Sequence, residues 1–344
     1  MLEGARNSVG RTKEMSKVKI GILGAGFIAK VHIGNLKNDE RTEIAAVVDL
    51  YLDKAKALAK EAGPQANAFS SLDELLASEI DAVYVTTPNT LHVEPVLKCL
   101  ENNVNVFCEK PMATSLHDAE RIKEARAKSK GIYNLGMNMR YGYVFKRVKH
   151  LIDSGEVMPY MVNVKLNRGE LLNPPWTADP KVTGGFLYET PIHLFDICRY
   201  LFGEVTTVKC EARQSISQSE FDDFAVLLTF ESGTIGTFVT SAHAGWSYPF
   251  QRLEIYGKYS TIAVEDMEKV IYAPGLKRAT EESDFKQVPF EEKWGYVEED
   301  RLFVDAILNG TKPPVTADDG YLLSRLLDGI YESAKTGNQS DFRK

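Results

Sequence analysis

The stretch VKIGILGAGFIAKVH, residues 18–32, decides the fold. Its first six residues are apolar at most positions, which predicts a buried strand over 18–23. A glycine-rich turn follows, reading G-x-G-x-x-A from Gly24 through Gly26 to Ala29. Apolar residues at helical spacing then predict a helix over 27–38. The order of strand, glycine turn and helix is typical of the unit that opens a dinucleotide-binding sheet.

Each small residue of this turn has a separate physical role. Gly24 permits the tight turn, Gly26 leaves room for a pyrophosphate near the backbone, and Ala29 lets the helix pack on the strand. The free N–H groups of the helix N-terminus, at Phe27 and Ile28, are expected to bind the phosphates. The alternative is a purely structural turn in an unrelated α/β domain.

An acid at the end of the second predicted strand supports the nucleotide interpretation. Asp49 ends the strand 43–49 and follows Gly26 by 23 residues. A carboxylate there accepts hydrogen bonds from the adenosine ribose hydroxyls and repels a 2′-phosphate. The next residues, LYLD, include no arginine, and Lys54 is the nearest base. We therefore expect NAD as the cofactor, with NADP as the less favoured choice.

The remaining pattern divides the chain in two. Apolar strands alternate with helices in the first part, which predicts a parallel, doubly wound α/β sheet. After about residue 140, strands follow one another and alternate polar with apolar residues, which predicts an α+β domain with a mostly antiparallel sheet. The predicted domains are a polar N-terminal tail, a dinucleotide-binding Rossmann domain, and a substrate-binding and oligomerisation domain, over 1–16, 17–140 and 141–344.

The individual elements can be placed along the chain. In the first part we expect further strands over 81–87, 104–109 and 132–138, and helices over 52–62, 90–103 and 116–129. In the second part we expect helices over 141–154, 296–309 and 318–335, and strands over 160–168, 205–214, 223–231, 234–243, 251–257 and 260–265.

Composition restricts the function classes. The 344 residues are 44% hydrophobic and carry a formal charge of −7, which disfavours nucleic acid or an anionic membrane as the main partner. No apolar run is long enough to span a membrane, and the N-terminus lacks a secretory signal. Four cysteines in apolar contexts predict buried thiols and a cytoplasmic protein: Cys99, Cys108, Cys198 and Cys210.

Two predicted strands end in polar motifs at the edge where open α/β sheets bind ligands. The first motif is TTPNTLH, residues 86–92, and the second is CEKP, residues 108–111. We expect the cofactor to lie against the polar residues of both motifs, while His92 is equally well explained as a surface histidine at a helix end. The expected cofactor contacts at these strand ends are Thr87, Pro88, Asn89, His92, Glu109 and Lys110.

A second stretch raises a question of its own. Residues 184–203 read GGFLYETPIHLFDICRYLFG, an apolar segment that contains Glu189, His193 and Asp196. Burying a polar group costs about 1–3 kcal/mol unless it is paired. The residues alone favour a structural explanation, in which His193 is a satisfied core histidine and Glu189 pairs with Arg199. The alternative is that the segment forms one wall of an active site.

These motifs together resemble the Gfo/Idh/MocA family of oxidoreductases. The motifs are GxGxxA, TPNxxH, EKP, GGxLxExxxHxxDxxRYLxG and FVDAILNG…P…DG…LLDGIYESAKTG, and the resemblance runs from about Lys17 to Gly337. It implies a Rossmann domain followed by an α+β domain. It also implies use of a nicotinamide cofactor to oxidise or reduce a hydroxyl carbon of a sugar, inositol or related polyol. Homodimers or homotetramers through the second domain's sheet are implied as well.

The resemblance also assigns roles. The lysine of EKP, which is catalytic or positions the substrate in the family, falls on Lys110. The family's D-x-G-x-H falls on Glu189 and His193, and Asp196 is implied to contact a substrate hydroxyl. Glutamate stands here for the usual aspartate, and Pro191 for the usual glycine. A helix can begin at Pro191 with Thr190 as its cap, or it can begin earlier, near Gly185.

The chemistry of alcohol oxidation suits these side chains. Histidine, with an unperturbed pKa of about 6.5, can take the hydroxyl proton, so His193 is the expected base. Lys110 is expected to donate to the reacting oxygen, and Glu189 to orient the pair. Arg168, Trp176 and Tyr296 are candidate substrate contacts. No histidine spacing indicates a metal site.

Two other functions are compatible with the sequence. The first is a glycosidase-type enzyme that uses tightly held NAD for transient oxidation and releases a free sugar without net NADH. The second is a non-catalytic nucleotide-binding regulator, for which the altered Glu189 and Pro191 are the only support.

Overall fold

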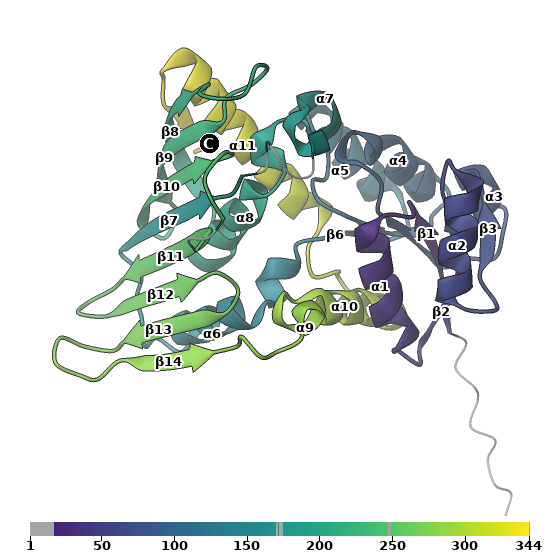
Figure 1. Cartoon of the computed structure of the whole chain (residues 1–344), viewed down its shortest axis with the longest axis horizontal. Coiled ribbons are helices and arrows are strands. Elements are labelled where there is room, and N and C mark those ends of the chain that lie inside the picture. The colour runs from purple at the N-terminus through teal and green to yellow at the C-terminus, as the bar shows by residue number, and fades with distance from the viewer. Residues whose placement is uncertain (1–16, 170, 172–174, 247–248, 344) are drawn as a thin grey trace, which may run out of the picture.

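Two sheets of different kinds divide the chain (Figure 1). The computed structural model describes residues 17–169, 171, 175–246 and 249–343. The predicted polar tail, 1–16, lies outside the described residues. None of the helices in these ranges has the length and apolarity to span a bilayer.

The first sheet has six strands in the order β3-β2-β1-β4-β5-β6, and every pairing is parallel. This order is the doubly wound arrangement that the sequence predicts. Its strands are β1 Val18–Leu23, β2 Thr42–Val48, β3 Asn67–Phe69, β4 Ala82–Val85, β5 Asn105–Cys108 and β6 Tyr133–Leu135. Its helices are α1 Phe27–Lys37, α2 Leu52–Ala62, α3 Leu72–Leu76, α4 Val93–Glu101 and α5 Leu116–Lys128.

The sequence missed β3 and α3. Three residues make too short a run for a period-two pattern, and α3 is a single capped turn whose N-cap Ser71 and Glu74 form a capping box. The Ser115 side chain caps α5, because it accepts from the Asp118 N–H.

The second sheet has nine strands in the order β14-β13-β12-β11-β7-β10-β9-β8-β15. It is mostly antiparallel, as predicted, but β7 and β10 pair in parallel. The strands are β7 Met161–Asn167, β8 Val205–Arg213, β9 Asp223–Phe230, β10 Ile235–Ser241, β11 Gln251–Tyr256, β12 Thr261–Glu265, β13 Lys269–Ala273, β14 Glu281–Asp284 and β15 Ser340–Asp341. The sequence prediction did not include β13, β14 or β15. Of these, β14 is a polar edge strand and β15 has only two residues.

Burial alternates along the strands of this second sheet. One face packs on the core, and the other leaves large apolar side chains exposed. Such an open apolar face is unusual for a protein that stays a monomer. The exposed side chains on its strands are Met161, Leu227, Ile235, Val239 and Tyr256.

Helices connect the two sheets. α11 (Ala317–Thr336) packs against both β8 and α5, and α10 (Tyr296–Asn309) packs against α1 (Figure 1). The C-terminal part of the chain therefore returns to the dinucleotide-binding sheet, and the domain boundary near residue 140 stays a prediction. The other helical segments are η1 Asn89–Leu91, η2 Asn138–Tyr141, α6 Tyr143–Asp153, η3 Pro175–Ala178, α7 Pro180–Thr183, η4 Phe186–Tyr188, α8 Pro191–Phe202 and α9 Phe290–Lys293.

The four cysteines are free and buried, as predicted. Burial raises the pKa of the Cys99 thiol to about 12, so this group stays protonated at neutral pH.

Candidate active site

The glycine turn after β1 has the geometry expected of a phosphate site. Gly24 has φ +104°, and a Cβ there would lie 2.7 Å from the Thr86 carbonyl oxygen. A Cβ on Gly26 would meet nothing within 4 Å, so the space over this residue is open. α1 has no side-chain cap and no acid in its first turn, and Phe27 at its start is 73% exposed. The open helix end therefore fits the pyrophosphate of a dinucleotide.

Asp49 lies beside this turn. Its Oδ2 accepts from the Ala25 N–H at 2.9 Å, and its Oδ1 accepts from the Tyr51 N–H at 2.9 Å. Each carboxylate oxygen has a second lone pair, so the group can still accept from ribose hydroxyls. Leu50 and Tyr51 are exposed next to it, and the Lys54 ammonium lies 4.8 Å from the centre of the Tyr51 ring.

Three predicted residues meet at the carboxyl edge of the first sheet. The Lys110 Nζ lies 3.1 Å from Glu189 Oε1 and 3.2 Å from the Glu189 carbonyl oxygen. The Asn89 Nδ2 donates to Glu189 Oε2 at 2.9 Å. Burial alone would raise the pKa of Glu189, but the Lys110 charge and the two side-chain donors lower it instead. The carboxylate is therefore ionised and is held from both sides.

His193 extends from α8 towards the same group. Its Nδ1 is buried and has no hydrogen-bond partner among the described residues. Burial, together with the Lys110 charge, lowers the pKa of His193 to about 4. The ring is therefore neutral at pH 7 and has a nitrogen available to a ligand.

The start of α8 explains how Glu189 and His193 are placed. η4 (Phe186–Tyr188) ends before Glu189, and α8 begins with Pro191 in its first turn, where the missing N–H costs nothing. The alternative of one helix from Gly185 is wrong. Thr190 occupies the N-cap position of α8, as expected, but its side chain makes no capping hydrogen bond.

His92 is buried between the two strand-end motifs. Its ring is fully buried, with Nδ1 at 2.7 Å from the Pro111 carbonyl oxygen and Nε2 at 2.8 Å from that of Thr87. The interpretation as a surface histidine is wrong. Burial lowers the pKa of His92, so the ring is neutral and donates from one nitrogen to one of these two carbonyl oxygens. The ring supports the shape of the two strand-end motifs, and its contact with a cofactor stays a prediction.

Asp196 also differs from the expectation. It is 1% exposed, and its two carboxylate oxygens each lie 2.6 Å from a nitrogen of the buried Arg140. The carboxylate is committed to Arg140 and has almost no accessible surface, so the structure does not support a contact with a substrate hydroxyl. Arg199, the structural partner considered for Glu189, instead pairs with Glu204 at 2.7 Å.

The three further candidates for substrate contacts, Trp176, Arg168 and Tyr296, lie on other segments of the chain. Trp176 is 46% exposed in η3. The Arg168 guanidinium lies 4.9 Å from the centre of the Trp246 ring and 5.8 Å from that of Phe250. Tyr296 starts α10, and its ring centre lies 6.2 Å from that of His32.

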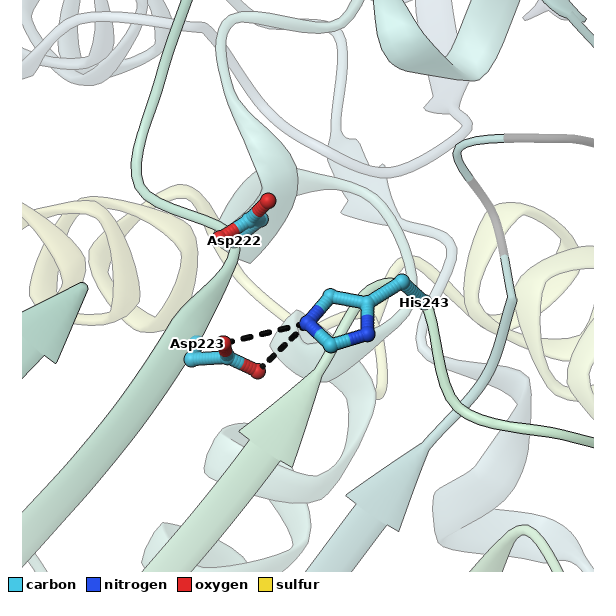
Figure 2. A group of neighbouring side chains, drawn as sticks. All are labelled: Asp222, Asp223 and His243. Atoms are coloured by element: carbon cyan, nitrogen blue, oxygen red, sulfur yellow. Dashed lines mark hydrogen bonds and ion pairs between the residues drawn. The ribbon is translucent and has the colours of Figure 1, made fainter. Parts of the chain in front are cut away.

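One group of side chains has the spacing of metal ligands. Figure 2 shows Asp222, Asp223 and His243, with the His243 Nε2 at 3.0 Å from Asp223. The Asp222 carboxylate already accepts three backbone N–H groups at 2.6 Å, from Ser215, Ile216 and Ser217. These bonds explain the buried Asp222 as the anchor of its loop. The expectation that the protein needs no metal stays a prediction.

Sequence reasoning missed a second polar group beside the site. His32 on α1 is fully buried and bridges Glu109, at the end of β5, and Asp300, on α10. These residues lie up to 268 positions apart in the chain. The only signal in the sequence was the predicted location of Glu109 at a strand end.

Comparison with known proteins shows what this geometry is similar to. The model of the Gfo/Idh/MocA oxidoreductases, described as "Oxidoreductase family, NAD-binding Rossmann fold", matches residues 18–137. Its companion, described as "Oxidoreductase family, C-terminal alpha/beta domain", matches residues 149–341. The first match includes every strand of the six-stranded sheet, and the second includes every strand of the nine-stranded sheet.

Individual relatives span almost the full length. Myo-inositol 2-dehydrogenase of Thermotoga maritima is 28% identical over 313 residues, which cover 88% of this chain and 92% of that protein. The crystal structure of a putative myo-inositol dehydrogenase from Sinorhizobium meliloti 1021 has 25% identity and a TM-score of 0.80, and the match covers 95% of this chain and all of that one. Levoglucosan dehydrogenase in complex with NADH and levoglucosan has a TM-score of 0.87 over 96% of this chain and all of that one. At 18% identity it shows the shared fold alone.

Proposed function

Because the chain belongs to the oxidoreductase family with an NAD-binding Rossmann fold, we propose that it oxidises a hydroxyl carbon of a sugar, inositol or related polyol with NAD. The observation that supports this proposal is the meeting of Lys110, Glu189 and Asn89 beside the neutral ring of His193. These groups lie at the carboxyl edge of the sheet, where ligands of this fold bind. The chemistry that NAD would supply when bound is acceptance of a hydride from the reacting carbon.

His193 serves as the base in this proposal. A neutral imidazole with an unpaired ring nitrogen can take the hydroxyl proton, which a protonated ring cannot do. The low pKa of the ring keeps it neutral across the physiological range. The same low pKa makes the ring a weak base in the ligand-free protein. We expect a bound substrate hydroxyl to supply the missing hydrogen-bond partner.

Lys110 stabilises the negative charge that develops on the reacting oxygen. An ammonium has three N–H donors, and two of the Lys110 contacts go to Glu189. The third donor is left for the substrate oxygen. Such a preorganised donor is typically worth about 10²–10³-fold in rate.

Glu189 holds the ammonium in place. Its two carboxylate oxygens connect Asn89, in η1 after β4, with Lys110, which follows β5. Glutamate, one methylene longer than aspartate, spans both partners here. The glutamate therefore orients the lysine, while the chemistry stays with Lys110 and His193.

The cofactor site fits NAD better than NADP. The open N-terminus of α1 and the space over Gly26 suit a pyrophosphate, and Asp49 suits unmodified ribose hydroxyls. A 2′-phosphate would meet the Asp49 carboxylate without a neighbouring arginine. Phe27, Ile28, Thr87 and Pro88 are the further contacts that we propose for the cofactor.

The substrate class rests on the relatives and on two side chains that the sequence predicts as substrate contacts. A named relative acts on myo-inositol, a cyclic polyol. The exposed Trp176 can stack on such a ring, and Arg168 can donate to its hydroxyls.

We further propose a homo-oligomer formed through the open face of the nine-stranded sheet. This face exposes Met161, Leu227, Ile235 and Val239 on neighbouring strands. Light scattering of the purified protein tests the proposal, and replacement of Leu227 and Val239 by lysine is expected to shift the mass towards the monomer.

The test of the function is NADH formation, followed by absorbance, with NAD and a panel of inositols, aldoses and their acids. Turnover on one compound, lost in His193→Ala and kept in the exposed control His117→Ala, supports the proposal. No NADH formation with any compound of the panel, while NAD still binds, contradicts it. Free sugar released from a glycoside without net NADH would indicate the glycosidase-type enzyme, and binding without any turnover would indicate the regulator.

A further inference from the structure

A fully buried histidine lies between two carboxylates next to the proposed catalytic lysine. The His32 Nε2 lies 3.0 Å from Glu109 Oε1, and its Nδ1 lies 2.8 Å from Asp300 Oδ1. Carboxylate oxygens only accept hydrogen bonds, so both ring nitrogens must carry a proton to satisfy this geometry. Burial alone would lower the pKa of His32, but Asp300 and Glu109 outweigh it and raise the pKa to about 10. His32 is therefore an imidazolium at neutral pH.

The second oxygen of Glu109 leads to the active site. Glu109 Oε2 accepts from the backbone N–H of Lys110 at 3.1 Å. Burial alone would raise the pKa of Glu109, but His32 and Lys110 lower it, so the carboxylate is ionised. One carboxylate thus joins the His32 ring to the peptide of Lys110.

The other end of the bridge is anchored as well. Asp300 Oδ2 accepts from the Asn35 Nδ2 at 2.8 Å, so α1 holds α10 through two side chains one turn apart. Glu299, beside Asp300, is fully buried without a side-chain partner among the described residues, and burial raises its pKa well above the usual range. Neither of its carboxyl oxygens hydrogen-bonds to His32. Tyr84 from β4 and Tyr296 from α10 are the other titratable groups whose rings face His32.

We propose that His32 is a positioning residue for Lys110: its imidazolium holds the Glu109 carboxylate, and Glu109 holds the peptide N–H of Lys110. The proposal rests on the function given above, in which Lys110 contacts the reacting oxygen. Without the imidazolium, two buried carboxylates lose their common partner, and Glu109 must move or take up a proton. The lysine then loses its placement, and a shift of about 1 Å in such a group can cost about 10²-fold in rate.

The test compares His32→Gln, Glu109→Gln and the double variant with Cys99→Ala, a matched buried substitution in α4 outside the cluster. In His32→Gln we expect kcat to fall by about 10–100-fold while KM and the dissociation constant of NAD stay within about twofold. Because His32 acts through Glu109, the loss in the double variant should be no greater than in Glu109→Gln alone.

A readout without turnover separates this proposal from the proposed function. The Lys110 charge lowers the pKa of His193 and the Glu109 charge raises it, so displacement of these two groups in His32→Gln should move that pKa. Nuclear magnetic resonance of 15N-histidine measures it even if no substrate is found. An unchanged kcat, an unchanged His193 pKa, or losses that multiply in the double variant would each overturn the proposal. If His32→Gln does not fold, Asp300→Asn is expected to shift the His193 pKa in the same direction by a smaller amount.

Discussion

Among the histidines that adjoin the strand end carrying Glu109 and Lys110, His32 and His193 have opposite charge states. His32 is held between two carboxylates, which raise its pKa to about 10. His193 has an unpaired Nδ1, and burial with the Lys110 charge lowers its pKa to about 4. Burial disfavours the charged form of both rings, so the neighbours decide the outcome.

The two sides of this strand end differ in whether their charged and polar groups are fully paired. On the side of His32, every charge has an opposite charge within hydrogen-bond distance, which suits a permanent support. On the side of His193, one nitrogen is left without a partner, which suits a group that must exchange a proton with a ligand. The sequence neighbours Glu109 and Lys110 connect the two.

The largest expected effect is on the chemistry. Lys110→Met keeps the volume of the side chain but removes the donor to the reacting oxygen, so kcat/KM should fall by about 10³-fold. Steady-state kinetics with the substrate found in the panel measure this loss. A fall of less than about tenfold, with the variant folded, would contradict the role of Lys110.

Asp196 tests whether a nearby buried charge serves stability alone. Asp196→Ala leaves the Arg140 guanidinium buried without its bidentate partner, so the free energy of unfolding should fall by about 3–5 kcal/mol. Asp223→Ala, which removes a partly exposed partner of His243, is the control and should cost about 0–1 kcal/mol. Urea unfolding measures both. Equal losses would show that burial of the Arg140 pair does not decide its contribution.

The pH dependence of stability distinguishes the two histidines. Since the pKa of His32 is raised in the folded state, its stabilisation is fully present below about pH 6.5 and is lost as pH rises through about 10. The loss should be about 1.4 kcal/mol per pH unit between those values, and it should be absent in His32→Gln. His193 has the opposite sign: with a lowered pKa, it reduces stability as pH falls from about 6.5 through 4. Urea unfolding of the wild type and both single variants across pH 5–10 measures the difference.

The smallest expected effect concerns cofactor choice. Asp49→Ser removes the carboxylate beside the glycine turn, so NAD should bind about tenfold more weakly, while the preference over NADP should shrink. Fluorescence titration with NADH and NADPH gives both dissociation constants. An unchanged preference would mean that Asp49 only supports the turn through its bond to the Ala25 N–H.

Local patterns in the sequence predicted the features that depend on short segments of the chain. The glycine turn, Asp49 and most strands and helices follow from spacing within a few residues, and the structure places them as expected. The meeting of Lys110 with Glu189, which are 79 residues apart, was expected only from the resemblance to a family. That the chain belongs to this family is confirmed.

Other features depend on contacts that no local pattern records. His32 and Asp300 meet only because α10 returns to α1, and the parallel pair of β7 and β10 needs the intervening helix α8 and strands β8 and β9. His92 and Asp196 have polar side chains at suitable positions in the motifs. Only the structure shows that the His92 ring lies against backbone carbonyls and that the Asp196 carboxylate is paired with Arg140.

The most direct test of the account is a nuclear magnetic resonance titration of the wild-type protein labelled with 15N-histidine. We expect His32 to carry protons on both nitrogens from pH 6 to 9, while His193 stays neutral over the same range. Assignment uses His32→Gln and His193→Ala. If either ring titrates near pH 6.5, the division between a charged support and a neutral base is contradicted.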